Sequence, residues 1–112
     1  MNYESSGRMD EQTRAFFLDI TGRFLGMSDS HPRLDYADLG AKGAQRVVVD
    51  LSEVRMVTSG GVRSLLTMKE EAEQHGLSFV IVCDQEAVLN LFRDLHLDRL
   101  LRVVRTREEI GA

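Results

Sequence analysis

Short apolar runs and amphipathic segments alternate along the middle of the chain. Residues 46–52 and 77–83 are continuous apolar runs rich in β-branched side chains, which is typical of buried parallel strands. Residues 62–75 and 84–96 instead place apolar side chains at helical spacing, with charged residues on the other face. A last apolar run covers 100–104. The order strand, helix, strand, helix, strand predicts an α/β sheet with parallel pairs joined by right-handed crossovers.

The boundaries of the two predicted helices follow from residues that favour helix ends. His75-Gly76 ends the first helix, because glycine readily takes the backbone conformation that follows a last helical turn. Asp84 is expected to cap the second helix, which then runs to His96. The inward face of this second helix is expected to carry Val88, Leu91, Phe92 and Leu95.

The first part of the chain carries weaker signals. Residues 15–21 contain aromatic and β-branched side chains and predict a strand that ends at Gly22. Residues 1–13 are polar and are expected to form a loosely ordered lead-in, with a short first strand as the alternative. A short helix is expected to begin at Pro32. One face of that helix would carry Leu34, Ala37 and Ala41.

Composition and charge narrow the class of protein. The chain has 112 residues, of which 43% are hydrophobic, enough for one core and one domain over residues 1–112. A net charge of -4 argues against generic binding to nucleic acids or anionic membranes, which requires clustered positive charge. No apolar run is long enough to span a membrane, no signal peptide is visible, and Cys83 is the only cysteine. We therefore expect a soluble cytoplasmic protein.

The signatures of common catalytic and metal sites are absent from the sequence. His31, His75 and His96 are far apart in the chain and distant from Cys83, whereas zinc ligands usually come in local pairs. The phosphate-binding loop, the dinucleotide-binding glycine motif and the nucleophile elbow of hydrolases are all missing. We therefore expect no metal, no cofactor and no enzymatic activity.

The turn Thr58–Val62 is the strongest candidate for a functional segment. It separates a brief extended piece, 54–57, from a helix, and a helix N-terminus leaves backbone N–H groups unpaired. Thr58 or Ser59 is expected to cap the helix, and Gly60-Gly61 would let a partner's backbone approach closely. Ser59 has three open interpretations: a helix cap only, a phosphorylation site at a partner interface, or part of an anion or nucleotide site.

The segment from Val47 to Val62 reads VVVDLSEVRMVTSGGV and resembles the signature of the STAS family, the sulfate transporter and anti-sigma factor antagonist domains. In that family Asp-Leu-Ser follows an apolar strand, and Asp-Ser-Ser/Thr-Gly-Leu opens the next helix. Residues 76–82 and 95–101 resemble the family's later strand and closing helix. The resemblance implies a non-catalytic α/β domain whose four- or five-stranded sheet is mixed but mostly parallel, with helices packed on one face.

The resemblance also implies a mechanism of partner switching. In well-known members of the family, the unphosphorylated domain binds an anti-sigma factor that is also a serine kinase of the GHKL ATPase type. This binding releases a sigma factor. Phosphorylation of the serine or threonine before the last glycine of the motif breaks the contact, and a PP2C-type phosphatase restores it.

The motif of this chain departs from the family pattern at the phosphorylation site. Thr58 stands at the family's aspartate, Ser59 at its first serine and Gly60 at the phosphoacceptor. Because glycine has no hydroxyl, the usual switch cannot operate at Gly60, which leaves Ser59 and Thr58 as candidate phosphorylation sites. The resemblance places the partner-binding loop at Thr58, Ser59, Gly60, Gly61, Val62 and Arg63.

Two further features have a structural and a functional interpretation. Asp50, with Ser52, is expected to shape a turn at the strand end by accepting backbone hydrogen bonds; a buried carboxylate for proton transfer is the alternative. The segment 93–107 holds five arginines and two aspartates and is expected to be a solvated helix edge. A docking patch for an acidic partner is the alternative there.

The leading hypothesis is therefore an anti-sigma factor antagonist whose protein partner is an anti-sigma factor or GHKL-type serine kinase, and which could also form a homo-oligomer. One alternative is a STAS subunit that regulates an ABC-type lipid transporter. The other is a scaffold component of a STAS signalling assembly.

Overall fold

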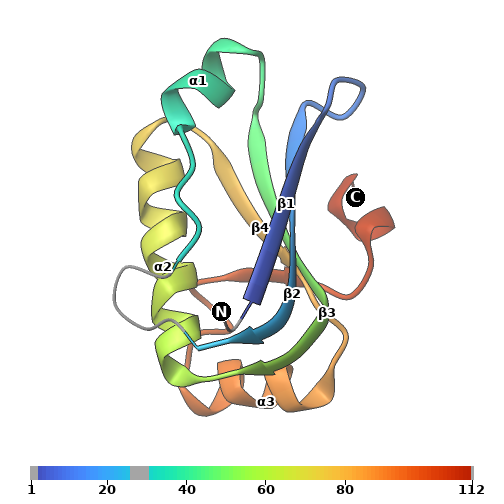
Figure 1. Cartoon of the computed structure of the whole chain (residues 1–112), viewed down its shortest axis with the longest axis vertical. Coiled ribbons are helices and arrows are strands. Elements are labelled where there is room, and N and C mark those ends of the chain that lie inside the picture. The colour runs from blue at the N-terminus through green and yellow to red at the C-terminus, as the bar shows by residue number, and fades with distance from the viewer. Residues whose placement is uncertain (1–2, 26–30, 112) are drawn as a thin grey trace.

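A five-stranded mixed sheet forms the centre of the molecule (Figure 1). The computed structural model describes residues 3–25 and 31–111. The strands are β1 (Tyr3–Asp10), β2 (Ala15–Phe24), β3 (Arg46–Val57), β4 (Ser78–Val82) and β5 (Arg102–Val104). They lie side by side in chain order, with β1 antiparallel to β2 and every other neighbouring pair parallel. The mixed, mostly parallel sheet expected from the sequence is thus confirmed.

Three helices cover one face of this sheet. These three helices are α1 (Tyr36–Ala41), α2 (Ser59–Gln74) and α3 (Glu86–Asp94). A short 3-10 helix, η1 (Arg107–Gly111), follows β5. Buried side chains of α1, α2 and α3 form the main core, whereas Ile110 of η1 packs with Phe17 and Val48 on the other face, which we call the open face. Figure 1 shows α1 and α2 on one side of the sheet and the C-terminal turn on the other. The prediction that helices pack on one face is confirmed.

The N-terminal residues form a strand, so the prediction of a loosely ordered lead-in is wrong for residues 3–10. Alternate residues of β1 hold it on the sheet: the Tyr3 ring packs edge-on against Phe24, with ring centroids 5.1 Å apart, and Met9 packs against the main core. Gly7 has no side chain where the ring of Phe16 lies, and a Cβ atom there would overlap that ring. The first strand that the sequence left as the alternative is therefore what forms, and its hydrophobic signal is weak because its exposed edge residues are polar.

Strand β3 continues past the expected turn. The sequence predicted a strand to residue 52 and a separate extended piece, but residues 46–57 form one strand whose pairing with β2 shifts register twice, at 50–53 and at 54–56. The first shift is a β-bulge. Asp19 of β2 pairs with Asp50, and Thr21, two residues later, pairs with Glu53, so β3 contains one extra residue at this point. The Ser52 N–H donates to Asp50 Oδ1 at 2.8 Å within this bulge.

Helix α1 begins later than the predicted start at Pro32. The Asp35 side chain caps it by accepting a hydrogen bond from the Asp38 N–H at 3.0 Å. Tyr36 and Leu39 are the buried residues of α1, and Ala37 and Ala41 are exposed, which contradicts the predicted inward face. The larger side chains decide which face is buried, because they remove more apolar surface from water than alanine does.

Helix α3 is shorter than expected and is held at its N-terminus by another residue. Gln85, not Asp84, is the N-cap residue, and its side chain forms no cap hydrogen bond. Instead the Gln85 Nε2 donates to the Val54 carbonyl at 2.6 Å, which fastens the start of α3 to β3. Leu89 is buried, whereas Leu95, expected to point inward, lies beyond the helix and is 39% exposed. Within the described parts of the chain, every helix is too short or too polar to cross a membrane.

Candidate functional site

Helix α2 begins at the point where β3 leaves the sheet, and Thr58 fixes this junction. Its backbone N–H donates to the Phe24 carbonyl at 3.3 Å, which ties it to the end of β2. The Thr58 hydroxyl donates to the Leu25 carbonyl at 2.9 Å and accepts from the Gly61 N–H at 3.3 Å. Thr58 is therefore the helix cap, and its hydroxyl is already engaged in two hydrogen bonds.

Two residues of the predicted partner-binding loop face the interior. A Cβ atom on Gly61 would overlap the Phe24 carbonyl oxygen and would lie 3.1 Å from Val57 Cγ1. Glycine at this position therefore allows α2 to pack directly on the end of β2. Val62 is 1% exposed and belongs to the main core. Gly61 and Val62 position the loop, and a partner could not reach their side-chain positions in this fold.

The accessible part of the loop forms a small surface at the start of α2. Ser59 and Arg63 are exposed, Gly60 is half-buried, and Met56, near the end of β3, is 47% exposed. We call Ser59, Gly60 and Arg63 the α2 N-terminal surface. Ser59 and Arg63 are one helical turn apart, so their side chains lie on the same side of α2. The unpaired N–H groups of the first turn and the Arg63 guanidinium make this surface locally positive.

Met56 is close to this surface in the chain but lies on the other face of the sheet. A methionine on a strand ordinarily fills a gap in the core, and Met68 of α2 does so with no exposed surface. Met56 instead lies close to the end of β3, beyond the bulge, where both Arg55 and Met56 are exposed. Its neighbour Val57 and the paired Phe24 face the main core, so Met56 points to the open face of the sheet.

Asp50 belongs to a separate cluster on the open face. The Arg107 Nε donates to Asp50 Oδ2 at 2.8 Å, and its Nη2 donates to Asp19 Oδ1 at 2.6 Å. The same guanidinium lies 4.6 Å from the ring centroid of Phe17. Burial would raise the pKa of Asp50, but hydrogen bonds from Ser52 and Arg107 outweigh it and hold that pKa below its ordinary value. A carboxylate kept ionised in this way is unsuited to proton transfer near neutral pH.

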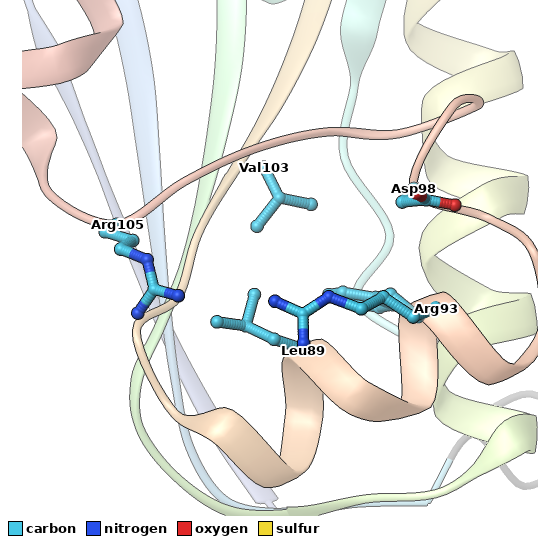
Figure 2. A pocket seen from close by; sticks show the side chains of 6 residues that line it. Leu89, Arg93, Asp98, Val103 and Arg105 are labelled. Atoms are coloured by element: carbon cyan, nitrogen blue, oxygen red, sulfur yellow. The ribbon is translucent and has the colours of Figure 1, made fainter.

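A small pocket lies between α3 and β5 (Figure 2). Its volume is about 210 Å³, and it is lined by Leu89, Phe92, Arg93, Asp98, Val103 and Arg105. Figure 2 shows Arg93 extending from α3 toward Leu89 and Val103, with Asp98 and Arg105 at opposite ends. This volume is below the range of about 300–1,000 Å³ that is usual for small-molecule sites.

The arginines of the 93–107 segment are largely engaged within the protein. Arg105 and Arg93 lie 3.1 and 3.9 Å from the two carboxylate oxygens of Glu86. The Arg102 Nη2 donates to the Ile110 carbonyl at 3.2 Å, and Arg107 binds the carboxylates on β2 and β3. These contacts favour a structural role for the segment over an open patch for an acidic partner. Among residues 3–25 and 31–111, His, Cys, Asp and Glu side chains form no group of three or more that could hold a metal ion.

The family of the chain follows from comparison with known proteins. A family model described as "Mlab, STAS domain" matches residues 8–104. The chain therefore belongs to the STAS domain family, as its motif suggested.

Solved structures of anti-sigma factor antagonists share this fold. One, from Mycobacterium paratuberculosis, aligns with a TM-score of 0.74 at 17% identity over 96% of this chain and 89% of that one. The anti-sigma factor antagonist SpoIIAA in its unphosphorylated form aligns with a TM-score of 0.65 at 13% identity, covering 96% of this chain and 94% of that chain. The Bacillus cell fate determinant SpoIIAA in the phosphorylated form gives 0.64 at 14% identity, with 96% and 97% covered. At these identities the similarity establishes the fold.

Proposed function

We propose that this chain is a non-catalytic, cytoplasmic interaction module that acts as an anti-sigma factor antagonist. Its partner is an anti-sigma factor that is also a GHKL-type serine kinase, and the contact uses the α2 N-terminal surface. One observation carries the proposal: Ser59 is exposed at the first residue of α2, next to the side-chain-free Gly60. Membership of the STAS family and the fold shared with anti-sigma factor antagonists support it.

Each residue of this surface has a physical role in docking. Gly60 lets a partner's backbone approach the first turn of α2 without meeting a side chain. Arg63 and the helix N-terminus attract negative charge, so the partner segment that docks here is acidic.

The switch in this chain rests on Ser59. Gly60 has no hydroxyl, so a kinase cannot transfer phosphate to the position that the family uses. Thr58 has a hydroxyl, but two hydrogen bonds hold it at the junction with β2. Ser59 is exposed, and a phosphate there adds about -1.5 to -2 charges to a surface that binds an acidic segment. Phosphorylation of Ser59 therefore releases the partner by repulsion.

Affinity capture with three forms of the chain tests the proposal. The baits are the wild type, Ser59→Asp and Ser78→Asp; Ser78 is an exposed serine that begins β4, at the opposite end of the sheet. We expect the wild type and Ser78→Asp to retain a protein with a GHKL ATPase domain, and Ser59→Asp to lose it. Equal retention by all three baits would contradict the role of Ser59. Retention of ATP-binding and permease subunits of a transporter instead would support the lipid-transporter alternative.

A gain-of-function variant tests the assignment of Gly60. Gly60→Ser places a hydroxyl where the family carries its phosphoacceptor, at a half-buried residue in the first turn of α2. With the captured kinase and labelled ATP, we expect Gly60→Ser to be phosphorylated faster than the wild type. Unchanged labelling would show that the kinase does not bind this loop in the way that the family motif implies.

A further inference from the structure

Strand β1 leaves a long edge of the sheet unpaired. It is the first strand in the sheet order and bonds only to β2, so its outer side has no partner strand within the described chain. It is eight residues long and contains no proline. Sheets usually protect such an edge with proline, charged side chains, a bulge, a very short strand or a covering segment, and of these β1 has only the charged side chains of Glu4, Arg8 and Asp10. The opposite edge has this protection: β5 is three residues long, and its Arg102 binds carbonyls of η1.

The side chains of β1 alternate between the two faces of the sheet. Tyr3 and Met9 pack against the main core on the helix-covered face. The guanidinium of Arg8 lies 5.1 Å from the Phe17 ring centroid, so Arg8 and the other even-numbered residues face the open side. Glu4, Ser6 and Arg8 are all exposed there. Glu4 and Arg8, which carry opposite charges, therefore lie two residues before and two residues after Ser6.

This spacing makes β1 complementary to itself in one register. When two copies of β1 pair antiparallel and extend the sheet, residues that lie opposite each other must point to the same face of the sheet. The two-fold axis of the pair must therefore lie between the two copies of one residue. With the axis at Ser6, Glu4 of each copy lies opposite Arg8 of the other, and Tyr3 lies opposite Met9. With the axis at Gly7, Glu4 would instead lie opposite Asp10, and two like charges would meet. Cross-strand pairs of opposite charge stabilise a sheet, and like charges destabilise it.

We propose that β1 is a dimerisation edge: it pairs antiparallel with β1 of a second copy of this chain, centred on Ser6. Two Glu4–Arg8 ion pairs then flank the axis on the open face, and two Tyr3–Met9 contacts flank it on the helix-covered face. The backbone groups of both outer edges become hydrogen-bonded, and the two five-stranded sheets join into one. This dimer is independent of whether the α2 N-terminal surface binds an anti-sigma factor.

Charge reversal and its rescue test the dimer in solution. Sedimentation velocity over a concentration series is expected to show the 12.6 kDa wild-type chain moving toward twice that mass as concentration rises. Glu4→Arg alone places two arginines opposite each other, and Arg8→Glu alone places two carboxylates opposite each other. Each single variant is expected to raise the dimer dissociation constant at least about tenfold, as two lost ion pairs and two new repulsions imply.

The rescue step separates specific pairing from a general effect of charge. A mixture of the Glu4→Arg and Arg8→Glu chains restores opposite charges at every pair and is expected to form heterodimers. The double variant Glu4→Arg with Arg8→Glu is expected to regain the wild-type dimer. Glu70→Arg makes the same charge change on an exposed position of α2 and is expected to leave the dissociation constant unchanged. A wild type that stays monomeric, single variants that associate normally, or a mixture that stays monomeric would overturn the proposal.

Discussion

Arg107 and Asp50 are 57 positions apart in the chain, yet the Arg107 Nε donates to Asp50 Oδ2 at 2.8 Å. This bond fastens η1 to the bulge of β3 and thereby holds Ile110 over the apolar side chains of the open face. The Asp50 side chain is 10% exposed and that of Arg107 is 33% exposed, so the pair is partly shielded from water. Removing one partner of such a pair is destabilising, because the other charge is left partly buried without a counter-charge.

Asp50→Asn is expected to lower the free energy of unfolding at neutral pH by about 1–3 kcal/mol, because the Arg107 guanidinium loses its buried counter-charge. The pKa of Asp50 in the folded protein lies below its ordinary value of 3.8. The stabilisation is therefore complete above about pH 4 and is lost as the pH falls through the lower folded value. Urea denaturation at about pH 7 and about pH 3 measures the free energy of unfolding at each pH. Acidification should lower this free energy less for the variant than for the wild type.

Asp84→Asn is the matched control for this measurement. Asp84 is exposed after β4, so the same substitution is expected to leave both the stability and its acid dependence close to the wild type. If the two variants behave alike, the Asp50–Arg107 pair does not contribute to the acid sensitivity of the fold.

The parts of the fold that the sequence predicted best are those that form because their apolar side chains are buried. The runs at 46–52 and 77–83 are buried on both faces of the sheet, and their apolar character identifies them without knowledge of their neighbours. Strand β1 has no such signal, since it depends on pairing with β2 and on single contacts such as Tyr3 with Phe24. The hydrophobic pattern of its residues does not by itself predict a strand, because the strand depends on its partner.

The same distinction applies to the candidate site. The motif located the turn at Thr58–Val62, but it could not separate the accessible Ser59 from the buried Gly61, because their burial depends on the end of β2. Arg107 lies far from Asp50 in the chain and next to it in space, so no local pattern predicts that pair. Sequence identified the segment, and long-range packing determined the role of each residue.

Gly61→Ala is expected to destabilise the protein by about 1–3 kcal/mol, because the new methyl group would overlap the Phe24 carbonyl oxygen and push α2 away from β2. Gly40→Ala is the matched control: Gly40 lies in α1, and a Cβ atom there would have no neighbour within 4 Å. Alanine favours helix over glycine, so this control is expected to be neutral or stabilising by up to about 1 kcal/mol. Thermal unfolding of both variants compares them directly, and equal melting temperatures would contradict the close contact.

Tyr36→Phe is expected to stabilise the protein slightly and to weaken its sensitivity to alkali. The Tyr36 hydroxyl is buried without a hydrogen-bond partner among the described residues, so its removal relieves an unpaired polar group. Burial, with a smaller effect of the Glu71 carboxylate, raises the pKa of Tyr36 from 10.0 to about 12. A raised pKa in the folded state means that stability is complete below pH 10 and falls as the pH rises toward 12.

Urea denaturation at about pH 8 and about pH 11 measures this alkaline loss. The wild type is expected to lose about 1 kcal/mol of stability from Tyr36 ionisation between these two pH values, and Tyr36→Phe is expected to lose less. Tyr3→Phe is the control, since Tyr3 is only half-buried, although burial raises its pKa as well. A larger effect of Tyr3→Phe than of Tyr36→Phe would show that the N-terminal strand, and not α1, controls alkaline unfolding.

Thr58→Val and Ser59→Ala separate the structural hydroxyl of the turn from the accessible one. Valine keeps the branched shape of Thr58 but removes the bonds to the Leu25 carbonyl and the Gly61 N–H, so a loss of about 1–2 kcal/mol in unfolding free energy is expected. Ser59→Ala is expected to change stability by less than about 0.5 kcal/mol, because Ser59 is exposed. In a kinase assay with the captured partner, the proposed switch predicts the reverse order: Ser59→Ala is expected to abolish labelling, and Thr58→Val is expected to retain it. Labelling that survives in Ser59→Ala and disappears in Thr58→Val would assign the phosphate to Thr58 and require the turn to open before the kinase can act.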